Sequence, residues 1–249
     1  MNKRLMFSAA LVMTLLSANA QKRAFTIEDL YRVKGVSSVS LSPDGKTVCY
    51  TASSSDLKNQ KSGSDIYIMN ADGSHAKALT EDGKSSSAVW SKDGKSIFFT
   101  NYEKGTAQIF RMDLTTCETE QVTDYELGIG SPVISPDERY IAFTAEVYPD
   151  LGADAKANKA RMEKKEQGPV QAHIADKLLY RHWTSYNDGR CNHLILFDTQ
   201  TKTYKDLTPG NYSLIFVVGG GITYQFSPDS KEICFVSNHD EHQEASTNA

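Results

Sequence analysis

After its first twenty residues, the 249-residue sequence has no hydrophobic run long enough to span a membrane. It also has no excess of basic residues, because 27 Lys and Arg are outnumbered by 31 Asp and Glu, for a net charge of −4. This balance argues against electrostatic binding of nucleic acid. Cysteine is scarce as well, and four cysteines do not by themselves indicate a disulfide framework in a chain of this size.

The first twenty residues predict a signal peptide. Lys3 and Arg4 precede an apolar run over residues 5–16, and Ala18 and Ala20 form a small-residue cleavage site. The alternative is a membrane anchor, but a run of about twelve apolar residues is too short for the hydrocarbon core, and no stop-transfer segment follows. We expect cleavage after Ala20, export to the periplasm, and a mature chain of net charge −6 that does not bind the membrane.

A turn motif recurs four times along the chain. In each copy a Ser is followed by Asp two positions later and by Lys or Arg four positions later, and a strand of β-branched and aromatic residues comes next. The copies start at Ser42, Ser91, Ser135 and Ser227. Proline sets φ at a turn's first corner, Asp accepts bonds from nearby amides, and Gly adopts positive φ. A ligand-binding loop is the alternative, but recurrence at one place in every unit favours a hairpin turn.

The second half of the unit also repeats, at residues 65–80, 108–123 and 193–208, so each unit supplies four short strands. The first three turns are 49 and 44 residues apart, close to the period of about 40–50 residues in propeller blades. We therefore predict an all-β fold, a β-propeller of four-stranded antiparallel blades over residues 36–249. The third and fourth turns are 92 residues apart, which predicts an insertion in blade three at about residues 146–190.

This propeller is expected to be incomplete. After the fourth turn the chain reaches the strand at 233–236 and soon ends, which provides three blades and part of a fourth. Closed propellers have about four to eight blades, and open blade edges are prone to aggregate. We therefore expect this chain to be the N-terminal piece of a longer protein.

A short helix is predicted ahead of the first blade, in a segment over residues 21–35. Thr26 can act as its N-cap with acidic residues in the first turn, and the helix runs through Leu30 and Val33 until Gly35 stops it. We expect this helix to cover an edge of the propeller.

A second helix is predicted in the insertion. Asp150 can cap a segment that runs to Glu166, and Gly168 and Pro169 end it. Its charges are mixed and its apolar residues few, which favours a solvated helix or a mobile excursion.

The later part of the insertion holds the candidate substrate-contact residues, Tyr180, Arg181, His182 and Trp183. Aromatic and guanidinium groups beside a cavity are common anchors for peptides. The alternative is a blade strand with alternate residues buried. This segment leads to a predicted turn at residues 187–189.

Two further groups of residues receive structural interpretations. Residues 239–242, His-Asp-Glu-His, could bind a metal, but nothing defines a geometry and no third ligand follows, so a polar loop is favoured and no metal site is predicted. Cys49 and Cys234 occupy the same strand register and are expected to be buried. Cys117 and Cys191 are expected in turns, where a disulfide between them is conceivable but unsupported.

Several segments together resemble the prolyl oligopeptidase family of serine peptidases, in particular the branch of dipeptidyl-peptidase V and acylaminoacyl-peptidase. The likeness covers essentially the whole mature chain. The Ser-Pro-Asp-Gly turn alone is shared with TolB-type propellers, so the specificity rests on the helix, the long insertion and the Arg-His-Trp sequence. The matching segments are residues 25–30, 42–46, 65–68, 180–183 and 187–190.

The resemblance implies a propeller that filters access to an α/β-hydrolase domain, whose Ser, Asp and His cleave short peptides. That Ser would lie in a Gly-x-Ser-x-Gly motif, which this sequence lacks, and the glycines at 219–221 are better explained as a loop. No catalytic residue and no cofactor is therefore assigned. Some relatives bind the substrate's amino terminus with propeller carboxylates, but Glu163, Glu166 and Asp176 cannot be matched to such a motif.

The sequence is compatible with two functions. In the first, the chain is the propeller portion of an exported dipeptidyl-type serine peptidase, inactive alone, whose partners are oligopeptides reached through the catalytic domain; the full-length protein could form a homodimer. In the second, it is a TolB-like periplasmic propeller that acts as a protein-interaction module.

Overall fold

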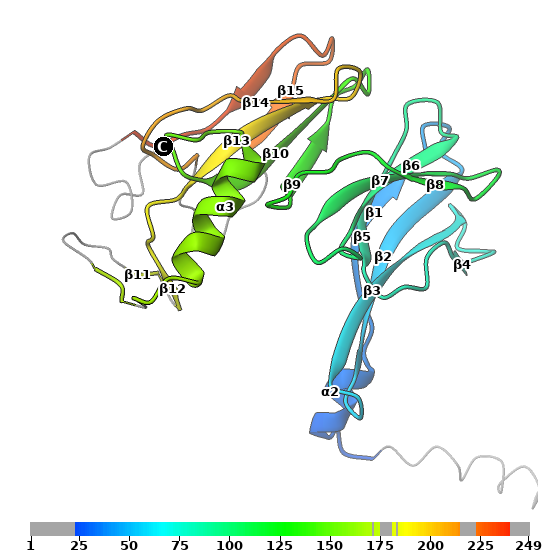
Figure 1. Ribbon diagram of the computed structural model, residues 1–249. Coiled ribbons are helices and arrows are strands. Elements are labelled where there is room, and N and C mark those ends of the chain that lie inside the picture. The colour runs from blue at the N-terminus through cyan, green and yellow to red at the C-terminus, as the bar shows by residue number, and fades with distance from the viewer. Residues whose placement is uncertain (1–22, 171, 175–180, 183, 215–222, 240–249) are drawn as a thin grey trace, which may run out of the picture.

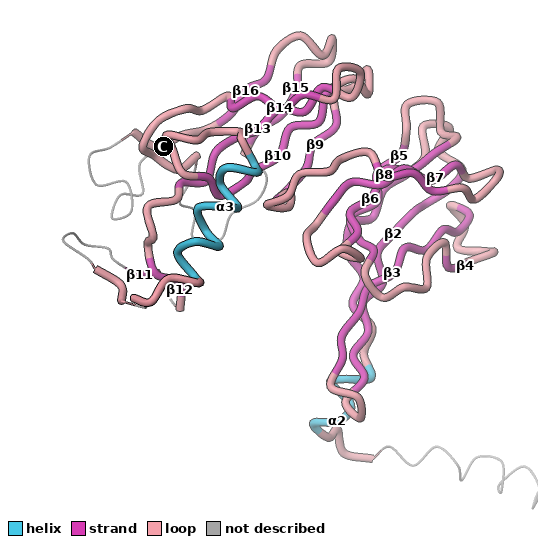
Figure 2. Tube along the Cα trace, in the orientation of Figure 1, coloured by secondary structure: helices cyan, strands magenta, loops and turns pink. Residues whose placement is uncertain are grey.

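The computed structural model describes residues 23–170, 172–174, 181–182, 184–214 and 223–239. The predicted signal peptide and the glycines at 219–221 lie outside these residues. The fold is mostly β, as predicted, with three four-stranded antiparallel sheets and two two-stranded ones in the described part (Figures 1 and 2). Neither described helix is long and apolar enough to cross a membrane.

The first two sheets follow the chain without interruption, each as a meander in sequence order. Such an order needs only short connections between antiparallel neighbours. The first contains β1 (Gly35–Leu41), β2 (Thr47–Asp56), β3 (Lys61–Asn70) and β4 (Lys77–Ala78). The second contains β5 (Ser85–Trp90), β6 (Ser96–Asn101), β7 (Gln108–Asp113) and β8 (Thr119–Gln121).

The third sheet has the same order but is interrupted between its second and third strands. The helix α3 (Ala155–Glu166) and the separate hairpin of β11 (Arg181–His182) and β12 (Ser185–Tyr186) lie in that interruption. The sheet contains β9 (Gly130–Ile134), β10 (Tyr140–Val147), β13 (Cys191–Asp198) and β14 (Thr203–Asp206). The predicted insertion in blade three is therefore present. A fourth sheet is represented by β15 (Tyr224–Phe226) and β16 (Ile233–Phe235).

The four turn motifs all form the predicted hairpin. In the first, the Asp44 carboxylate accepts a hydrogen bond from the Ser42 hydroxyl at 2.6 Å and from the Lys46 N–H at 3.1 Å. Gly45 has φ +72°, and Glu138 and Ser230 take up the same left-handed conformation at 61° and 62° in the third and fourth copies. The local hydrogen bonds of Ser and Asp therefore maintain the turn even where glycine is replaced.

The hydrophobic core lies between successive sheets, so each inner sheet buries both faces. In β10, Ile141 and Phe143 pack toward the second sheet, whereas Ala142 packs toward the fourth. In β6, Ile97 faces the first sheet and Phe98 faces the third. This alternation follows from the two-residue period of a strand, and it produces the stacked arrangement of a propeller.

The predicted burial of the two equivalent cysteines is only half confirmed. Cys49 is fully buried and packs on the second sheet, but Cys234 is exposed. Cys49, Phe98 and Ala142 each face the following sheet, and among the described residues no further sheet covers the corresponding face of β16. Burial therefore depends on the neighbouring sheet and not on the register.

The prediction for the other two cysteines also needs correction. Cys117 lies in a turn with φ 60°, as expected. Cys191 instead opens β13 and pairs with Val147, because the register between β10 and β13 extends over eight residue pairs. All four cysteines are free thiols.

The N-terminal helix α2 (Ile27–Arg32) is shorter than predicted. Val33 adopts an extended conformation with ψ 122° and ends the helix, and Gly35 begins β1. Thr26 is the N-cap, and its N–H donates to the Asp29 carboxylate at 2.9 Å. The helix lies beside the far end of the β2–β3 hairpin (Figure 1) and has no buried residue. The expectation that it covers a sheet edge is therefore not met.

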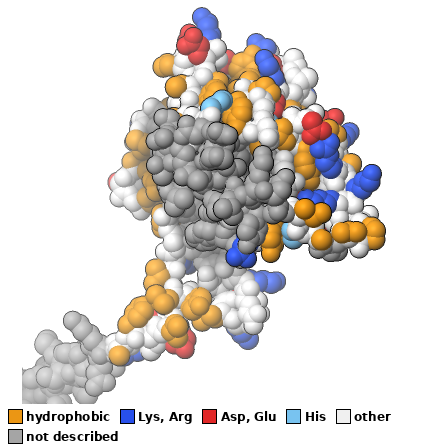
Figure 3. Space-filling model, turned by 90° about the vertical axis from the view of Figure 1, so that its left-hand side faces the viewer, with side chains coloured by type: hydrophobic (Ala, Val, Ile, Leu, Met, Phe, Trp, Pro, Cys, Tyr) orange, Lys and Arg blue, Asp and Glu red, His pale blue; other side chains and the backbone are white. Residues whose placement is uncertain are grey.

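The region of α2 and β1 exposes most of its large apolar side chains. Figure 3 shows hydrophobic side chains gathered at the lower end of the molecule, where α2 lies. The side chains of Phe25, Ile27, Leu30, Val33, Val36, Val39 and Leu41 are all more than half exposed. An exposed apolar area of this kind is typical of an interaction surface.

Candidate functional site: the excursion of the third sheet

The excursion comprises residues 148–190, which leave the third sheet after Val147 and return at Cys191. Val147 and Cys191 are paired across β10 and β13, so both ends of the excursion lie side by side at one end of this sheet. Helix α3 extends away from that end (Figure 1). A segment anchored in this way can carry side chains beyond the sheet without disturbing its hydrogen bonds.

The turn that opens the excursion is organised by Asn158, which is fully buried. Its side-chain oxygen accepts from the Tyr148 N–H at 2.6 Å, and its amide donates to the carbonyls of Gly152 at 3.0 Å and Asp154 at 2.8 Å. Burying an amide is favourable only when such partners are present. Asn158 therefore ties α3 to the end of β10.

The N-cap of α3 is Asp154, whereas the sequence predicted Asp150. The Asp154 carboxylate accepts from the Ala157 N–H at 3.0 Å. Gly152 has φ +50°, and this left-handed residue prevents a helix from beginning at Asp150. The helix itself is present and mostly exposed, as its composition predicted.

Asp150 instead forms an ion pair with Arg161 from the helix. Two hydrogen bonds of 2.8 and 2.6 Å join the guanidinium to the two carboxylate oxygens, and the guanidinium lies 4.6 Å from the centre of the Tyr148 ring. The Arg161 guanidinium lowers the pKa of Asp150. Tyr148 is buried, and its hydroxyl has no hydrogen-bond partner among the residues that the structure describes.

The end of the excursion is held by Arg190. Its Nε lies 2.9 Å from Asp188, its Nη1 lies 3.0 Å from Glu146 of β10, and the same Nη1 is 3.9 Å from the Met162 sulfur. The predicted turn at 187–189 is present, because the Gly189 N–H donates to the Asn187 side chain at 3.0 Å. Arg190 thus joins this turn to both the sheet and the helix.

The four predicted substrate-contact residues are only partly described. Tyr180 and Trp183 lie outside the described residues. Arg181 and His182 form β11, which pairs with Ser185 and Tyr186 of β12, and the Arg181 side chain is exposed. The alternative interpretation as a blade strand is wrong for Arg181 and His182, because their two-stranded sheet is separate from the third sheet.

Aromatic side chains lie next to this hairpin. The ring of His173 stacks on that of Tyr186 with the centroids 3.9 Å apart and the planes 6° apart. Arg181 is opposite Tyr186 in the hairpin. Exposed rings and a guanidinium at one place suit an extended peptide, which offers carbonyl groups and apolar side chains.

The other candidate groups do not form a site in the described residues. Glu163 and Glu166 lie near the end of α3, whereas Asp176 is outside the described part. No cluster of three metal-ligating side chains occurs within the described ranges. Of residues 239–242 only His239 is described, and its ring lies 4.1 Å from that of Tyr212.

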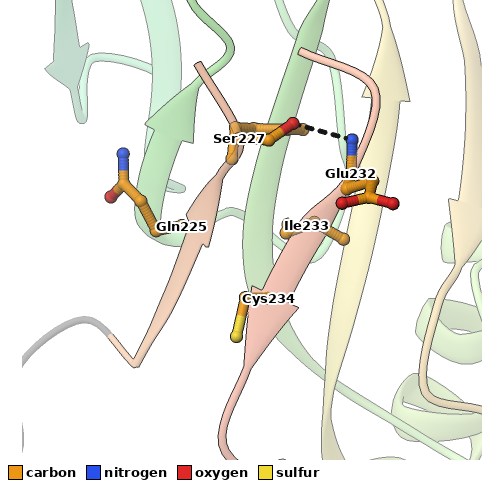
Figure 4. Close-up of a pocket in the computed structure, with 6 residues that line it drawn as sticks. Gln225, Ser227, Glu232, Ile233 and Cys234 are labelled. Carbon is orange, nitrogen blue, oxygen red and sulfur yellow. Dashed lines mark hydrogen bonds between the residues drawn. The ribbon is translucent and has the colours of Figure 1, made fainter. Parts of the chain in front are cut away.

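A shallow pocket lies on the fourth sheet, but it does not have the character of an active site. Figure 4 shows that its walls come from β15, β16 and the turn between them, where the Ser227 hydroxyl accepts from the Glu232 N–H at 3.0 Å. Phe226 and Ile233 of this lining pack in the interface with the third sheet, whereas Cys234 is exposed. The lining residues are Gln225, Phe226, Ser227, Glu232, Ile233 and Cys234.

Comparison with known proteins supports the fold and relates it to peptidases. A family model described as the TolB beta propeller domain matches residues 17–167. The chain belongs to this family. It is 29% identical to dipeptidyl-peptidase 5 of Porphyromonas gingivalis over 248 residues, which cover 95% of this chain and 35% of that protein.

Two further matches agree with this relationship. The chain is 25% identical to the uncharacterized peptidase YuxL of Bacillus subtilis over 90% of its own length and 33% of that protein. The acylaminoacyl peptidase of Pyrococcus horikoshii shares its fold, with a TM-score of 0.53 and 19% identity over 72% of this chain and 26% of that one. The resemblance inferred from the sequence is therefore confirmed, and this TolB-family chain spans about a third of the length of the peptidases it matches.

Proposed function

We propose that this chain forms the propeller portion of an exported dipeptidyl-type serine peptidase that cleaves short oligopeptides. The observation that carries the proposal is the match along 95% of this chain to a dipeptidyl-peptidase of which it covers 35%. In this proposal the propeller controls access of substrates, and the remainder of the enzyme performs acyl transfer to a serine.

The excursion is the proposed peptide-contacting element. Asn158 and Arg190 anchor the two ends of the excursion at the third sheet, and Arg181 is exposed on the hairpin of β11 and β12. Such a group can donate hydrogen bonds to the carbonyls of an extended peptide. Tyr180, His182 and Trp183 are proposed to contribute to the same surface.

Kinetics of the full-length enzyme test this assignment. Arg181→Ala is expected to raise KM for a dipeptidyl reporter substrate while kcat changes little, because the contact is made in both the ground and the transition state. Lys156→Ala, an exposed change on α3, is the matched control. Equal kinetic constants for Arg181→Ala and the control would exclude Arg181 from substrate binding.

The chain by itself is proposed to be inactive, since its sequence has no Gly-x-Ser-x-Gly motif. Purified chain should hydrolyse dipeptidyl reporter substrates no faster than a mock purification from the same host. Hydrolysis that scales with the concentration of the chain and persists after removal of host peptidases would contradict this.

Export is proposed from residues 1–20. The mature protein recovered from the periplasmic fraction should begin at Gln21, which N-terminal sequencing can establish. Recovery of the protein in the cytoplasm with Met1 retained would refute export.

The second candidate is a TolB-like interaction module, which the match to the TolB propeller family favours. The coding sequence beyond Ala249 separates the two. Additional blades followed by a Gly-x-Ser-x-Gly motif would support the peptidase, whereas additional blades that complete a propeller without this motif would support the interaction module.

A further inference from the structure

The first three sheets each carry a polar connection, here called the latch, between the third strand and the segment that leaves the fourth. In every copy a polar residue of the third strand, whose side chain is here called the latch side chain, lies at the same position. The N–H of the residue that follows it donates to a threonine hydroxyl after the fourth strand, at 3.0, 2.9 and 2.9 Å in the three sheets. The latch pairs are Asp65 with Thr80, Gln108 with Thr123, and His193 with Thr208.

In the first two sheets the side chain at this position is a carboxylate or an amide. Asp65 accepts from the Thr80 hydroxyl at 3.1 Å and from the Gly83 N–H at 3.0 Å. Gln108 accepts from the Thr123 hydroxyl at 2.9 Å and from the Tyr125 N–H at 3.1 Å, and its amide donates to the Tyr125 carbonyl at 2.7 Å. Asp65 thus accepts hydrogen bonds, whereas the Gln108 amide accepts and donates and carries no titratable proton.

The third latch is different because both nitrogens of its imidazole face acceptors. His193 is fully buried. Its Nδ1 is 2.7 Å from an oxygen of the Asp206 carboxylate, and its Nε2 is 2.9 Å from the Gly210 carbonyl. A carbonyl cannot donate a hydrogen bond, and an ionised carboxylate only accepts, so with Asp206 ionised both ring nitrogens donate and the ring is an imidazolium.

The surroundings favour this charged form. Burial by itself lowers the pKa of His193, but hydrogen bonds with Asp206 and with Cys191 at the start of β13, together with the Gly210 carbonyl, outweigh it and raise the pKa to about 9. From the loop after β14, the Tyr212 ring lies 6.5 Å away and is itself beside His239. Gly152 of the excursion approaches the same Asp206 oxygen, and the other oxygen accepts from the Thr208 N–H at 2.9 Å.

We propose that His193 is a pH-sensitive latch that holds residues 207–214 on the third sheet while its imidazole carries both protons. Loss of one proton leaves Nδ1 or Nε2 facing an acceptor without a hydrogen to donate, so that this connection opens. The loop it releases leads toward the fourth sheet, and Asp206 lies against the excursion. The second latch is an internal control, because the Gln108 amide has no titratable proton.

Hydrogen exchange on the full chain tests the latch, with protection corrected for the intrinsic pH dependence of exchange. Below about pH 6.5, where the imidazole is protonated whether the latch is open or closed, protection of residues 207–214 should be constant. From there to about pH 9 it should fall by up to tenfold per pH unit, because opening releases a proton. Residues 122–129, which follow the Gln108 latch, should not change. A parallel response of both loops, or none in either, would overturn the proposal.

A variant provides the second measurement. His193→Gln copies the side chain of the second latch and is expected to remove the pH response at residues 207–214, whereas His75→Gln, at an exposed histidine, should retain it. Persistence of the response in folded His193→Gln would assign it to another group. If His193→Gln does not fold, the comparison of the two loops in the unaltered chain still decides.

Discussion

The interfaces between sheets and the excursion of the third sheet are stabilised by different physical means. The interfaces are formed by apolar side chains from both neighbours, such as Phe98 with Phe143, and burial of this surface is the dominant stabilising contribution. The excursion buries few side chains, and Asn158 and Arg190 hold it by hydrogen bonds and ion pairs. The difference indicates that the sheets set global stability, whereas the excursion can change its conformation or sequence without unfolding them.

The largest effect is expected at an interface. Phe143→Ala removes a fully buried ring that lies 5.2 Å from Tyr125 and 6.1 Å from Tyr204, and should lower the free energy of unfolding by about 3–5 kcal/mol. Chemical denaturation of the chain measures this loss. Phe235→Ala, at a ring that is 37% exposed, is the matched control and should cost clearly less. Equal losses would mean that the interface between the second and third sheets does not dominate stability.

A smaller and more local effect is expected from Asn158→Ala. The change leaves the Tyr148 N–H and two carbonyls without their partner, and should cost about 1–3 kcal/mol. We expect faster proteolytic cleavage within residues 148–170, with little change in the unfolding of the sheets. Lys156→Ala, which is exposed on the same helix, should cleave at the parent rate. Loss of cooperative unfolding of the whole chain in Asn158→Ala would show that the excursion is not independent.

The smallest effect is expected from Arg161→Ala. The ion pair with Asp150 is solvent-exposed, with side-chain exposures of 42% and 62%, so water and salt screen its attraction. The thermal midpoint should stay within error of the parent chain, in low and in high salt. A salt-dependent decrease comparable to that of Asn158→Ala would show that ion pairs, and not the buried amide, anchor the helix.

Much of the fold could be predicted because its signals are local. The Ser-x-Asp turn forms its hydrogen bonds within five residues, as Ser42 and Asp44 show, and the strand after each turn is rich in β-branched and aromatic residues. These features require no knowledge of distant parts of the chain. The position of α3 was also predicted, but its cap was not, because Gly152 adopts a backbone conformation that composition does not reveal.

The latch and the anchors of the excursion could not be recognised in the same way. Asp65, Gln108 and His193 occupy one place in the repeat, as do Thr80, Thr123 and Thr208, so the sequence contained a signal. What each side chain does depends on the atoms that later residues bring to it. These are the Gly83 N–H for Asp65, and the Asp206 carboxylate and the Gly210 carbonyl for His193. Arg190 likewise joins Glu146 and Met162, which only the folded excursion brings together.

The sequence by itself determined the repeat, the turns, the strands and the place of the insertion, because local hydrogen bonds, the residue types of each strand and the spacing of the turns dictate them. Tertiary structure decided which of these residues are buried and which are charged. Cys49 and Cys234 occupy the same register, yet only Cys49 has a sheet packed over it. The two ring nitrogens of His193 face a carboxylate oxygen of Asp206 and the carbonyl of Gly210, and this geometry supports the proposed protonated form. Burial and protonation depend on the atoms that surround a side chain in space, and the folded arrangement of the sheets supplies them.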